Sequence, residues 1–147
     1  MELKFFSVDE IAEHPDFPKV VEAYTSESGN PDLGKGAPAI EHYKMLESAG
    51  MLHVEGAVDG DRLVGLIVLV VSLYPHFGVK VGSVDAIYLD KDYRQGAAGL
   101  KLIRRIEHVA KEMGAVGVYF GARRDSRLAK LYDRLFTPMN ALWWVKL

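Results

Sequence analysis

A basic turn rich in small residues lies between two elements with clear hydrophobic patterns. Positions 96–99 read Gly-Ala-Ala-Gly, and Lys91, Arg94 and Lys101 flank them. The first turn of a helix has backbone N–H groups without partners, and the helix dipole adds about half a positive charge there. Small side chains leave these donors accessible, so the turn suits a phosphate or a diphosphate. An ordinary strand–loop–helix joint, whose glycines only permit close packing, explains the same residues.

A strand and a long amphipathic helix position this turn. The run VDAIYLD at 84–90 is short, β-branched and aromatic, which is typical of a buried strand. The helix that follows the turn carries one apolar stripe of 3.6-residue period, formed by Leu102, Ile103, Ile106, Val109, Ala110 and Met113. Gly114 then stands where a left-handed residue just past a helix end is expected.

The turn resembles the acetyl-CoA-binding motif of the GNAT N-acetyltransferases, which reads Arg-x-x-Gly/Ala-x-Gly/Ala after a strand. Residues 94–99, Arg-Gln-Gly-Ala-Ala-Gly, fit this pattern, with Ala97 where most members carry glycine. The resemblance runs from about Leu52 to the C-terminus. It is strongest to a phage-encoded branch, whose pattern is matched by His76, Asp85, Tyr88 and Arg94.

The resemblance implies where acetyl-CoA binds. The diphosphate would lie on the turn formed by Arg94, Gln95, Gly96, Ala97, Ala98, Gly99 and Leu100. The pantetheine arm would pair, like an extra strand, with the backbone of Ile87, Tyr88 and Leu89.

Tyr132 is the candidate proton donor to the departing thiolate. The run 131–135, Leu-Tyr-Asp-Arg-Leu, resembles the family's helix in which a tyrosine hydroxyl meets the coenzyme sulfur. The residues alone favour a core tyrosine, because Tyr132 shares a helical face with three leucines. The chain also departs from the family pattern, with Phe136-Thr137 in place of the common Gly-Phe and Asp125 in place of an asparagine.

Asp85 is the candidate general base, acting directly or through a water. It lies in an otherwise apolar strand, where burial of a carboxylate would favour proton uptake. A carboxylate hydrogen-bonded to neighbouring backbone is the alternative. Glu55 and His76 are rival bases and candidate acceptor-binding residues, and an imidazole titrates near neutral pH without burial.

Composition limits the class of protein. The chain has 147 residues, which predicts one domain over 1–147. Its net charge of −2 gives no reason to expect nucleic acid or an anionic membrane as a partner. There is no cysteine for a disulfide or a thiol nucleophile. The five histidines share no metal-ligand spacing, so we predict no metal. The N-terminus does not resemble a signal peptide, and the longest apolar run (63–73) is too short for a membrane helix, which favours a cytoplasmic protein.

The remaining pattern predicts alternating strands and helices. We expect strands at 3–7, 52–58, 63–73, 116–120 and 141–147, and helices from Ser7, at 18–25, at 38–48 and from a cap at Asp125. This order predicts an α/β (α+β) sandwich with a mixed sheet. The resemblance implies that the sheet is mostly antiparallel and flanked by helices.

The sequence therefore predicts an acetyl-CoA-dependent N-acetyltransferase that acts on a small-molecule or peptide amine. A non-catalytic acyl-CoA-binding or structural protein of the same fold is the alternative, because fold does not imply function. A P-loop at 29–36 is disfavoured, since Gly36 supplies no hydroxyl for magnesium and a helix, not a strand, precedes it. Trp143 and Trp144 give both faces of the last expected strand an aromatic, so a homodimer contact is possible there.

Overall fold

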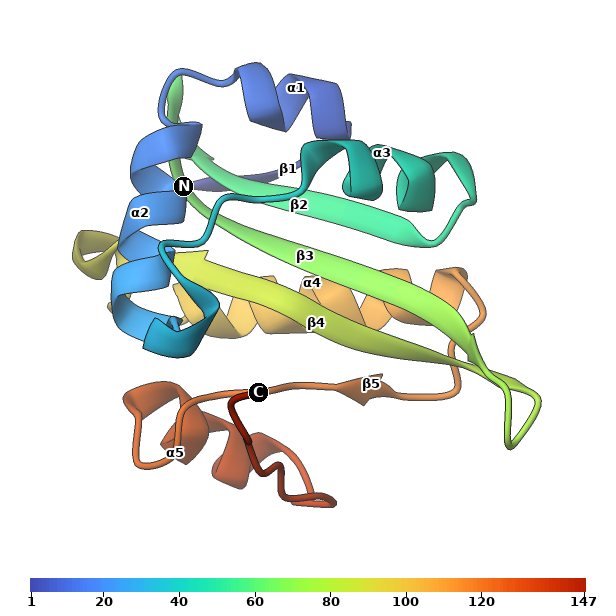
Figure 1. The fold of residues 1–147 in the computed structure, drawn as a ribbon. Helices are drawn as coiled ribbons and strands as arrows, with labels where there is room; N and C mark the ends of the chain where they lie inside the picture. Colours follow the sequence, from blue (N-terminus) through green and yellow to red (C-terminus); the bar gives the residue numbers. More distant parts are fainter.

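A twisted five-stranded sheet forms the centre of the computed structural model, which describes residues 1–147 (Figure 1). The strands lie in the order β1-β2-β3-β4-β5. The first four pair antiparallel, and β5 pairs parallel with β4. Their bounds are β1 Glu2–Phe6, β2 Leu52–Asp59, β3 Arg62–Tyr74, β4 Val79–Leu89 and β5 Val118–Tyr119. The predicted mixed, mostly antiparallel α+β fold is confirmed.

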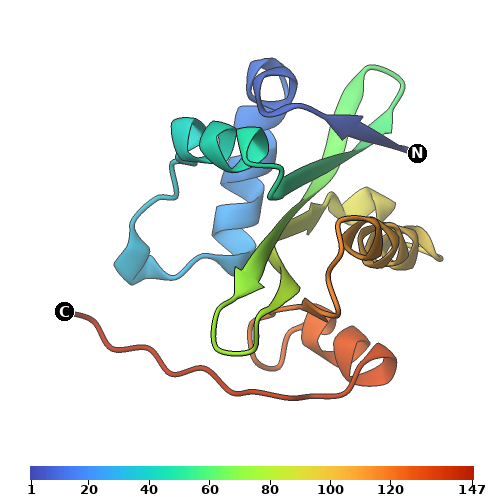
Figure 2. The same ribbon diagram turned by 90° about the vertical axis from the view of Figure 1, so that its right-hand side faces the viewer.

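Helices cover both faces of the sheet. Three helices lie over one face and α4 lies behind the other, while α5 lies beyond β5 (Figures 1 and 2). The helices are α1 Val8–Glu13, α2 Phe17–Ser28, α3 Ile40–Ser48, α4 Ala98–Glu112 and α5 Arg127–Leu135. Short 3₁₀ turns at Pro31–Leu33 and Lys91–Tyr93 precede α3 and α4.

Strand β3 is buried on both faces because its side chains alternate between two cores. Leu66 and Val68 pack in the core beneath α1, α2 and α3. Ile67 and Leu69 pack against α4, whose buried residues Leu102, Ile103, Ile106, Val109 and Ala110 all belong to the predicted stripe. A central strand covered on both sides explains the long uninterrupted apolar run of this segment.

Helix ends follow the local signals in the sequence. Ser7 and Glu10 form a complete capping box at the start of α1. Gly50 and Gly114 have φ angles of 67° and 88° and follow the ends of α3 and α4, a conformation that strains other residues. At α5, however, the predicted cap at Asp125 is wrong. Ser126 is the N-cap and accepts a hydrogen bond from the Ala129 N–H at 3.0 Å.

The C-terminal part of the sheet is smaller than the sequence predicts. The expected strand at 116–120 contracts to two residues, Val118 and Tyr119, of which Tyr119 is exposed. The expected strand at 141–147 is wrong, because these residues leave α5 as an unpaired, extended and exposed segment (Figure 2). A β-prone sequence becomes a strand only where an edge is available to pair with it.

Candidate active site

The turn before α4 presents an uncapped helix N-terminus. Gly96 has a φ of 64°, which turns the chain into the helix, and the N-cap Ala97 has no side chain that accepts a hydrogen bond. The first turn of α4 contains no acidic residue. A Cβ added at Gly96 or Gly99 would meet nothing within 4 Å, so the backbone there is open to approach. These features suit an anion at the helix N-terminus.

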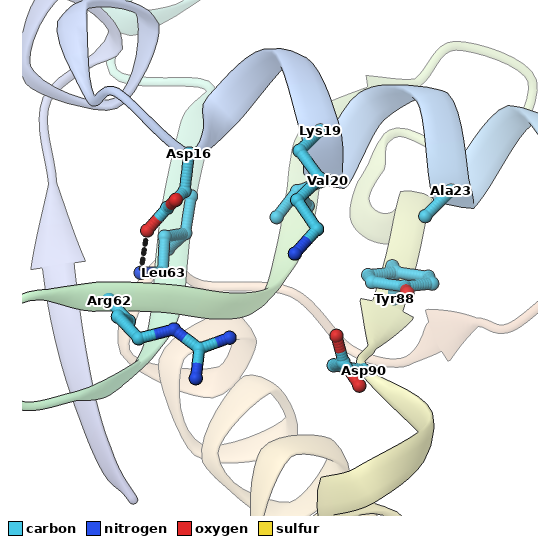
Figure 3. Close-up of a pocket in the computed structure, with 8 residues that line it drawn as sticks. All are labelled: Asp16, Lys19, Val20, Ala23, Arg62, Leu63, Tyr88 and Asp90. Carbon is cyan, nitrogen blue, oxygen red and sulfur yellow. Dashed lines mark hydrogen bonds between the residues drawn. The ribbon is translucent and has the colours of Figure 1, made fainter.

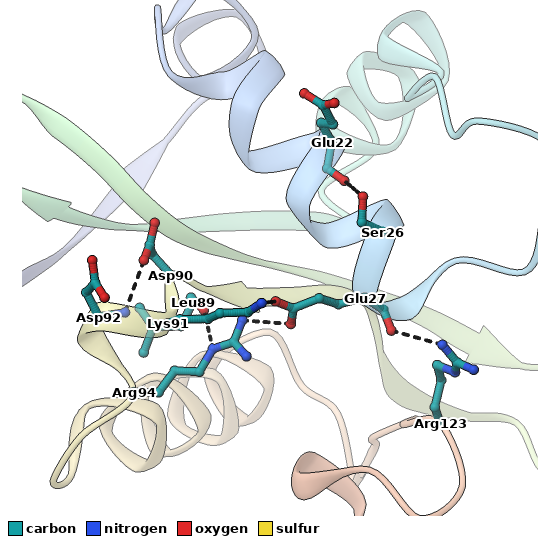
Figure 4. Close-up of polar contacts among 9 residues, drawn as sticks. All are labelled: Glu22, Ser26, Glu27, Leu89, Asp90, Lys91, Asp92, Arg94 and Arg123. Atoms are coloured by element: carbon teal, nitrogen blue, oxygen red, sulfur yellow. Dashed lines mark hydrogen bonds and ion pairs between the residues drawn. The ribbon is translucent and has the colours of Figure 1, made fainter.

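Arg94 is held beside this turn by three neighbours, of which Figure 4 shows Leu89 and Glu27. Its Nε donates to the Leu89 carbonyl at 2.6 Å, and its Nη2 donates to Glu27 Oε2 at 2.7 Å. Its guanidinium also lies over the Tyr88 ring, 5.4 Å from the centroid. Lys91 Nζ lies 3.7 Å from the other oxygen of Glu27. Glu27 at the end of α2 therefore faces two of the three cations that flank the turn, Lys91 and Arg94.

Strand β4 has an open edge next to the turn. Strand β5 pairs with Gly82 and Ser83, and the Val116 N–H donates to the Lys80 carbonyl, so the part of β4 from Val84 to Leu89 is paired on the β3 side alone. The Asp90 N–H donates to the Val64 carbonyl, so the main-chain groups of Asp90 face β3. Along an antiparallel strand, successive residues direct their main-chain N–H and C=O groups alternately to the two sides. The main-chain groups of Leu89 and Ile87 therefore point to the open edge, as the Leu89 carbonyl does toward Arg94. An extended ligand could pair there.

Asp85 lies at a bulge in β4. Val68 pairs with Ala86 and Leu69 pairs with Val84, so Asp85 is the extra residue between them. The expectation that its carboxylate is buried is wrong, because the bulge turns it out of the apolar core and leaves it exposed. Tyr43 Oη of α3 donates to Asp85 Oδ2 at 2.5 Å, and Tyr24 Oη of α2 donates to the Asp85 carbonyl at 3.3 Å.

Tyr24 and Tyr43 are site residues that sequence reasoning missed. Burial raises the pKa of both phenols, and the neighbouring Asp85 raises it further. Both residues also pack their rings on the core beneath α2 and α3. The sequence did contain a signal for them, because each tyrosine lies on the apolar stripe of its helix. A tyrosine hydroxyl buried in this way usually needs a hydrogen-bond partner, here Asp85.

Tyr132 holds the one buried side-chain polar atom in the chain without a hydrogen-bond partner. The residue is 8% exposed, and its ring lies 5.3 Å from that of Phe120 and 5.8 Å from that of Phe136. Burial raises its pKa well above the ordinary value, with a smaller electrostatic contribution from Tyr24. The hydroxyl is therefore protonated at neutral pH. A buried hydroxyl without a hydrogen-bond partner lowers the stability of a fold. Such groups often have a catalytic or ligand-binding role that explains why they are kept.

Glu55 is committed to a buried ion pair on the face of α4. It is 2% exposed, and its two oxygens contact His53 Nε2 at 2.6 Å and Arg105 Nε at 3.2 Å. Burial alone would raise the pKa of Glu55, but the hydrogen bonds from His53 and Arg105 outweigh it and lower the pKa below its ordinary value. A carboxylate held in its charged form stabilises the packing of α4.

Replacing Glu55 by glutamine is expected to destabilise the fold at neutral pH by about 1–3 kcal/mol, the usual cost of removing a charged partner from buried donors. The folded-state pKa lies below the ordinary 4.5, so the charge stabilises the protein above that pH and less as pH falls through the folded value. Thermal unfolding from pH 7 to pH 3 measures this difference. The exposed pair of Glu41 and Lys44 supplies the control, and Glu41→Gln should change little. If the difference in unfolding free energy between Glu55→Gln and the parent protein grows as the pH falls, the charged Glu55 does not stabilise the fold.

His76 lies at the tip of the β3–β4 hairpin. Its ring packs edge-on against Phe77 at 4.9 Å, and Phe77 packs on Tyr74. The strand from Val79 to Asp85 separates this tip from the bulge by about 20 Å at 3.3 Å per residue. His76 and Asp85, which the sequence predicted for the same reaction, are therefore not brought together.

A small cavity lies under α2, beside the end of β4 (Figure 3). Its volume of about 20 Å³ is enough for a single water and far too small for a nucleotide. Tyr88 and Asp90 line it opposite Lys19, and Asp16 Oδ2 accepts the Leu63 N–H at 3.0 Å beside it. The cavity is a packing feature of α2.

No three His, Asp or Glu side chains gather as they would around a metal ion. None of the helices combines the length and apolarity needed to cross a bilayer.

Comparisons with known proteins agree with this geometry. The family model described as the acetyltransferase (GNAT) family matches residues 17–136. No curated protein matches the chain. Among solved structures, the ribosomal-protein-alanine N-acetyltransferase from Brucella melitensis biovar Abortus 2308 is similar, with 19% identity, a TM-score of 0.70, and coverage of 99% of this chain and 98% of that chain.

Two other solved structures show the same fold. An aminoglycoside acetyltransferase from an uncultured soil metagenomic sample has 14% identity and a TM-score of 0.74, over 98% of this chain and 95% of that one. A putative acetyltransferase from Pyrococcus furiosus has 21% identity and a TM-score of 0.67, over 99% of both chains. The family model covers most of the chain, and the fold is shared from end to end. This chain belongs to the acetyltransferase (GNAT) family.

Proposed function

We propose that this protein is an N-acetyltransferase that moves the acetyl group of acetyl-CoA directly to an acceptor amine. The observation that carries the proposal is the unpaired hydroxyl of Tyr132, which is buried and protonated on a side chain packed against Phe120 and Phe136. A protein that only binds a coenzyme has no need of such a group.

The coenzyme is proposed to lie along the turn and the open edge of β4. The free N–H groups of the first turn of α4, from Ala98 to Leu100, suit the diphosphate, with Arg94 and Lys91 supplying positive charge. The outward main-chain groups of Ile87 and Leu89 suit the amide-bearing pantetheine arm. Gln95, Gly96, Ala97 and Gly99 would form the surface on which the diphosphate rests, and Tyr88 would support Arg94 from below.

Acetyl transfer to an amine has three chemical demands. The acceptor ammonium must lose a proton, the oxyanion formed at the thioester carbonyl must be stabilised, and the departing sulfur benefits from a donor. We assign the first to the Asp85 carboxylate, directly or through a water, with Tyr43 holding it in place. The outward Ile87 N–H is assigned to the oxyanion and the Tyr132 hydroxyl to the sulfur. The amine nitrogen replaces sulfur on the acetyl carbon, and coenzyme A leaves as the thiol.

The acceptor is proposed to be a small-molecule or peptide amine that approaches Asp85 from the face of α2 and α3. The exposed carboxylate and the phenols of Tyr24 and Tyr43 form a polar group that can attract and orient an ammonium. Solved structures with this fold include proteins described as an aminoglycoside acetyltransferase and a ribosomal-protein-alanine N-acetyltransferase, and both kinds of acceptor carry amines. His76 and Glu55 lie away from this group, so the proposed reaction places no step on either.

A screen of amines tests the proposal. Wild-type protein with acetyl-CoA and a panel of aminoglycosides, polyamines and peptides should release free thiol only when an amine is present, with the acetylated amine seen by mass spectrometry. Initial rates with both substrates varied should give intersecting lines, because both bind before transfer. Thiol release that never exceeds the amine-free rate would favour the non-catalytic coenzyme-binding protein.

Replacing Asp85 by asparagine is expected to lower turnover by roughly 100-fold, the usual order for losing a general base. The Michaelis constant for acetyl-CoA should change little, because no part of the proposed coenzyme site contacts this side chain. Tyr43→Phe removes only the hydroxyl that holds the carboxylate and should have a smaller effect on the same rate. A turnover in Asp85→Asn equal to wild type would remove Asp85 from the reaction.

A further inference from the structure

The carboxylate of Glu27 lies against two cations of the proposed coenzyme turn (Figure 4). One of its oxygens is 2.7 Å from Arg94 Nη2, and the other is 3.7 Å from Lys91 Nζ. Glu27 belongs to the last turn of α2 and is 67 positions away from Arg94 along the chain. Asp90 and Asp92 lie within the turn itself but form no ion pair with either cation. The anion that neutralises these cations therefore comes from a separate element.

Arg94 does not depend on Glu27 for its position. Its Nε donates to the Leu89 carbonyl at 2.6 Å, and its guanidinium lies over the Tyr88 ring. Both neighbours belong to β4 and would remain if the Glu27 carboxylate moved away. The side chains of Arg94 and Glu27 are 30% and 31% exposed, so the ion pair between them contributes little to the stability of the fold. Another anion could therefore replace Glu27 while Arg94 stays in place.

The end of α2 also has attachments that do not involve the Glu27 carboxylate. Arg123 Nη1 donates to the Glu27 carbonyl oxygen at 3.4 Å, and Tyr24 Oη donates to the Asp85 carbonyl at 3.3 Å. These hydrogen bonds hold the backbone of the helix whatever the Glu27 side chain does. Rotation of one partly exposed side chain is therefore enough to uncover the two cations, and such rotations are fast.

We propose that Glu27 is an internal substitute for the coenzyme diphosphate, and that acetyl-CoA binds by displacing its carboxylate from Arg94 and Lys91. This inference rests on the coenzyme site of the proposed function. A diphosphate that reached both cations would meet the Glu27 carboxylate beside them, and like charges repel at such short distances. The diphosphate carries more negative charge than one carboxylate, and it also gains the free N–H groups at the start of α4. The exchange therefore favours the coenzyme.

The reverse exchange promotes release of the product. Acetyl-CoA and free coenzyme A carry the same diphosphate, so Glu27 competes with both to the same extent. After transfer, return of the Glu27 carboxylate to Arg94 and Lys91 restores the two ion pairs as the product leaves. Glu27 thus lowers the affinity of the turn for the coenzyme without contacting the reacting atoms.

Calorimetric titrations with acetyl-CoA and with coenzyme A test this competition. Glu27→Gln keeps the shape of the side chain and removes its charge. It should bind both ligands about 2- to 5-fold more tightly than the parent protein, the range expected for losing a partly exposed ion pair. Glu27→Ala should also bind more tightly, because Arg94 keeps Leu89 and Tyr88. Glu22→Gln removes the same charge from the same helix, where the carboxylate points away from the turn, and should bind like the parent protein (Figure 4).

Acetyl-pantetheine is the matched ligand control. It lacks the diphosphate, so it leaves Glu27 in place and should bind the parent protein and Glu27→Gln equally. Weaker binding of acetyl-CoA by Glu27→Ala would show that Glu27 positions Arg94 for the coenzyme, and this would overturn the proposal. Unchanged affinity in Glu27→Gln, or an equal gain in Glu22→Gln, would overturn it as well. In these cases the proposed function stands, whereas a parent protein that binds no acetyl-CoA would remove both.

Discussion

Removing the hydroxyl of Tyr132 is expected to slow acetyl transfer by roughly 10- to 1,000-fold, the usual order for losing a general acid. Tyr132→Phe keeps the ring and therefore its packing on Phe120 and Phe136. Because the buried hydroxyl has no partner in the protein, its loss should leave the melting temperature unchanged or slightly higher. Affinity for acetyl-CoA should hardly change. Turnover, coenzyme affinity and thermal unfolding are measured on the same preparation.

Tyr119 supplies the matched control for this substitution. It is the tyrosine of β5, is exposed and has no assigned role, so Tyr119→Phe should keep full turnover. Unchanged turnover in Tyr132→Phe, with a melting temperature lowered by the loss of about 1 kcal/mol, would mean that Tyr132 is a structural residue. The donor to the sulfur would then be another group or water.

Placing a carboxylate at the start of α4 is expected to abolish most coenzyme binding. Gly99→Glu adds bulk and a negative charge where the diphosphate is proposed to lie, and the added side chain meets no neighbour within 4 Å at its Cβ. A like charge at this distance repels the diphosphate, so affinity for acetyl-CoA should fall at least about 10-fold, or about 1.4 kcal/mol. Calorimetric titration of acetyl-CoA measures the loss.

Ser48→Glu is the control, since it adds one negative charge at an exposed position of α3. It should bind acetyl-CoA as tightly as the parent protein. Raising salt should weaken binding to the parent, because exposed charges of the turn are screened within about 8–10 Å. A folded Gly99→Glu protein with unchanged affinity would place the coenzyme elsewhere.

Local patterns predicted the elements on which the site is built. The stripe from Leu102 to Ala110 is the buried face of α4, and the small residues of the turn leave its N-terminus open. Both features depend on neighbours within a few residues, where periodicity and turn chemistry are informative. The pairing of Tyr43 with Asp85 and of Glu27 with Arg94 joins residues 42 and 67 positions apart, and no local pattern encodes such contacts.

Two sequence predictions failed for reasons of tertiary context. The apolar run around Asp85 suggested that its carboxylate is buried, but the bulge at Asp85 interrupts the pairing of the strand and leaves the carboxylate exposed. The β-prone run at 141–147 predicted a strand, but a strand needs an edge to pair with, and the chain leads this run away from β5. Composition alone carries neither the position of a bulge nor the direction of a chain after its last helix.

Amide hydrogen exchange with and without acetyl-CoA tests the coenzyme site most directly, because it needs no knowledge of the acceptor. The outward N–H groups of Ile87 and Leu89 and those of the first turn of α4 have no partner in the chain and should become protected when the coenzyme binds. The amide exchange rates of the loop at 29–36 should not change, because the diphosphate is not expected to contact this loop. Protection concentrated at 86–89 and 96–101 is the predicted result. Saturating acetyl-CoA that leaves both stretches exchanging as in the free protein would contradict the account.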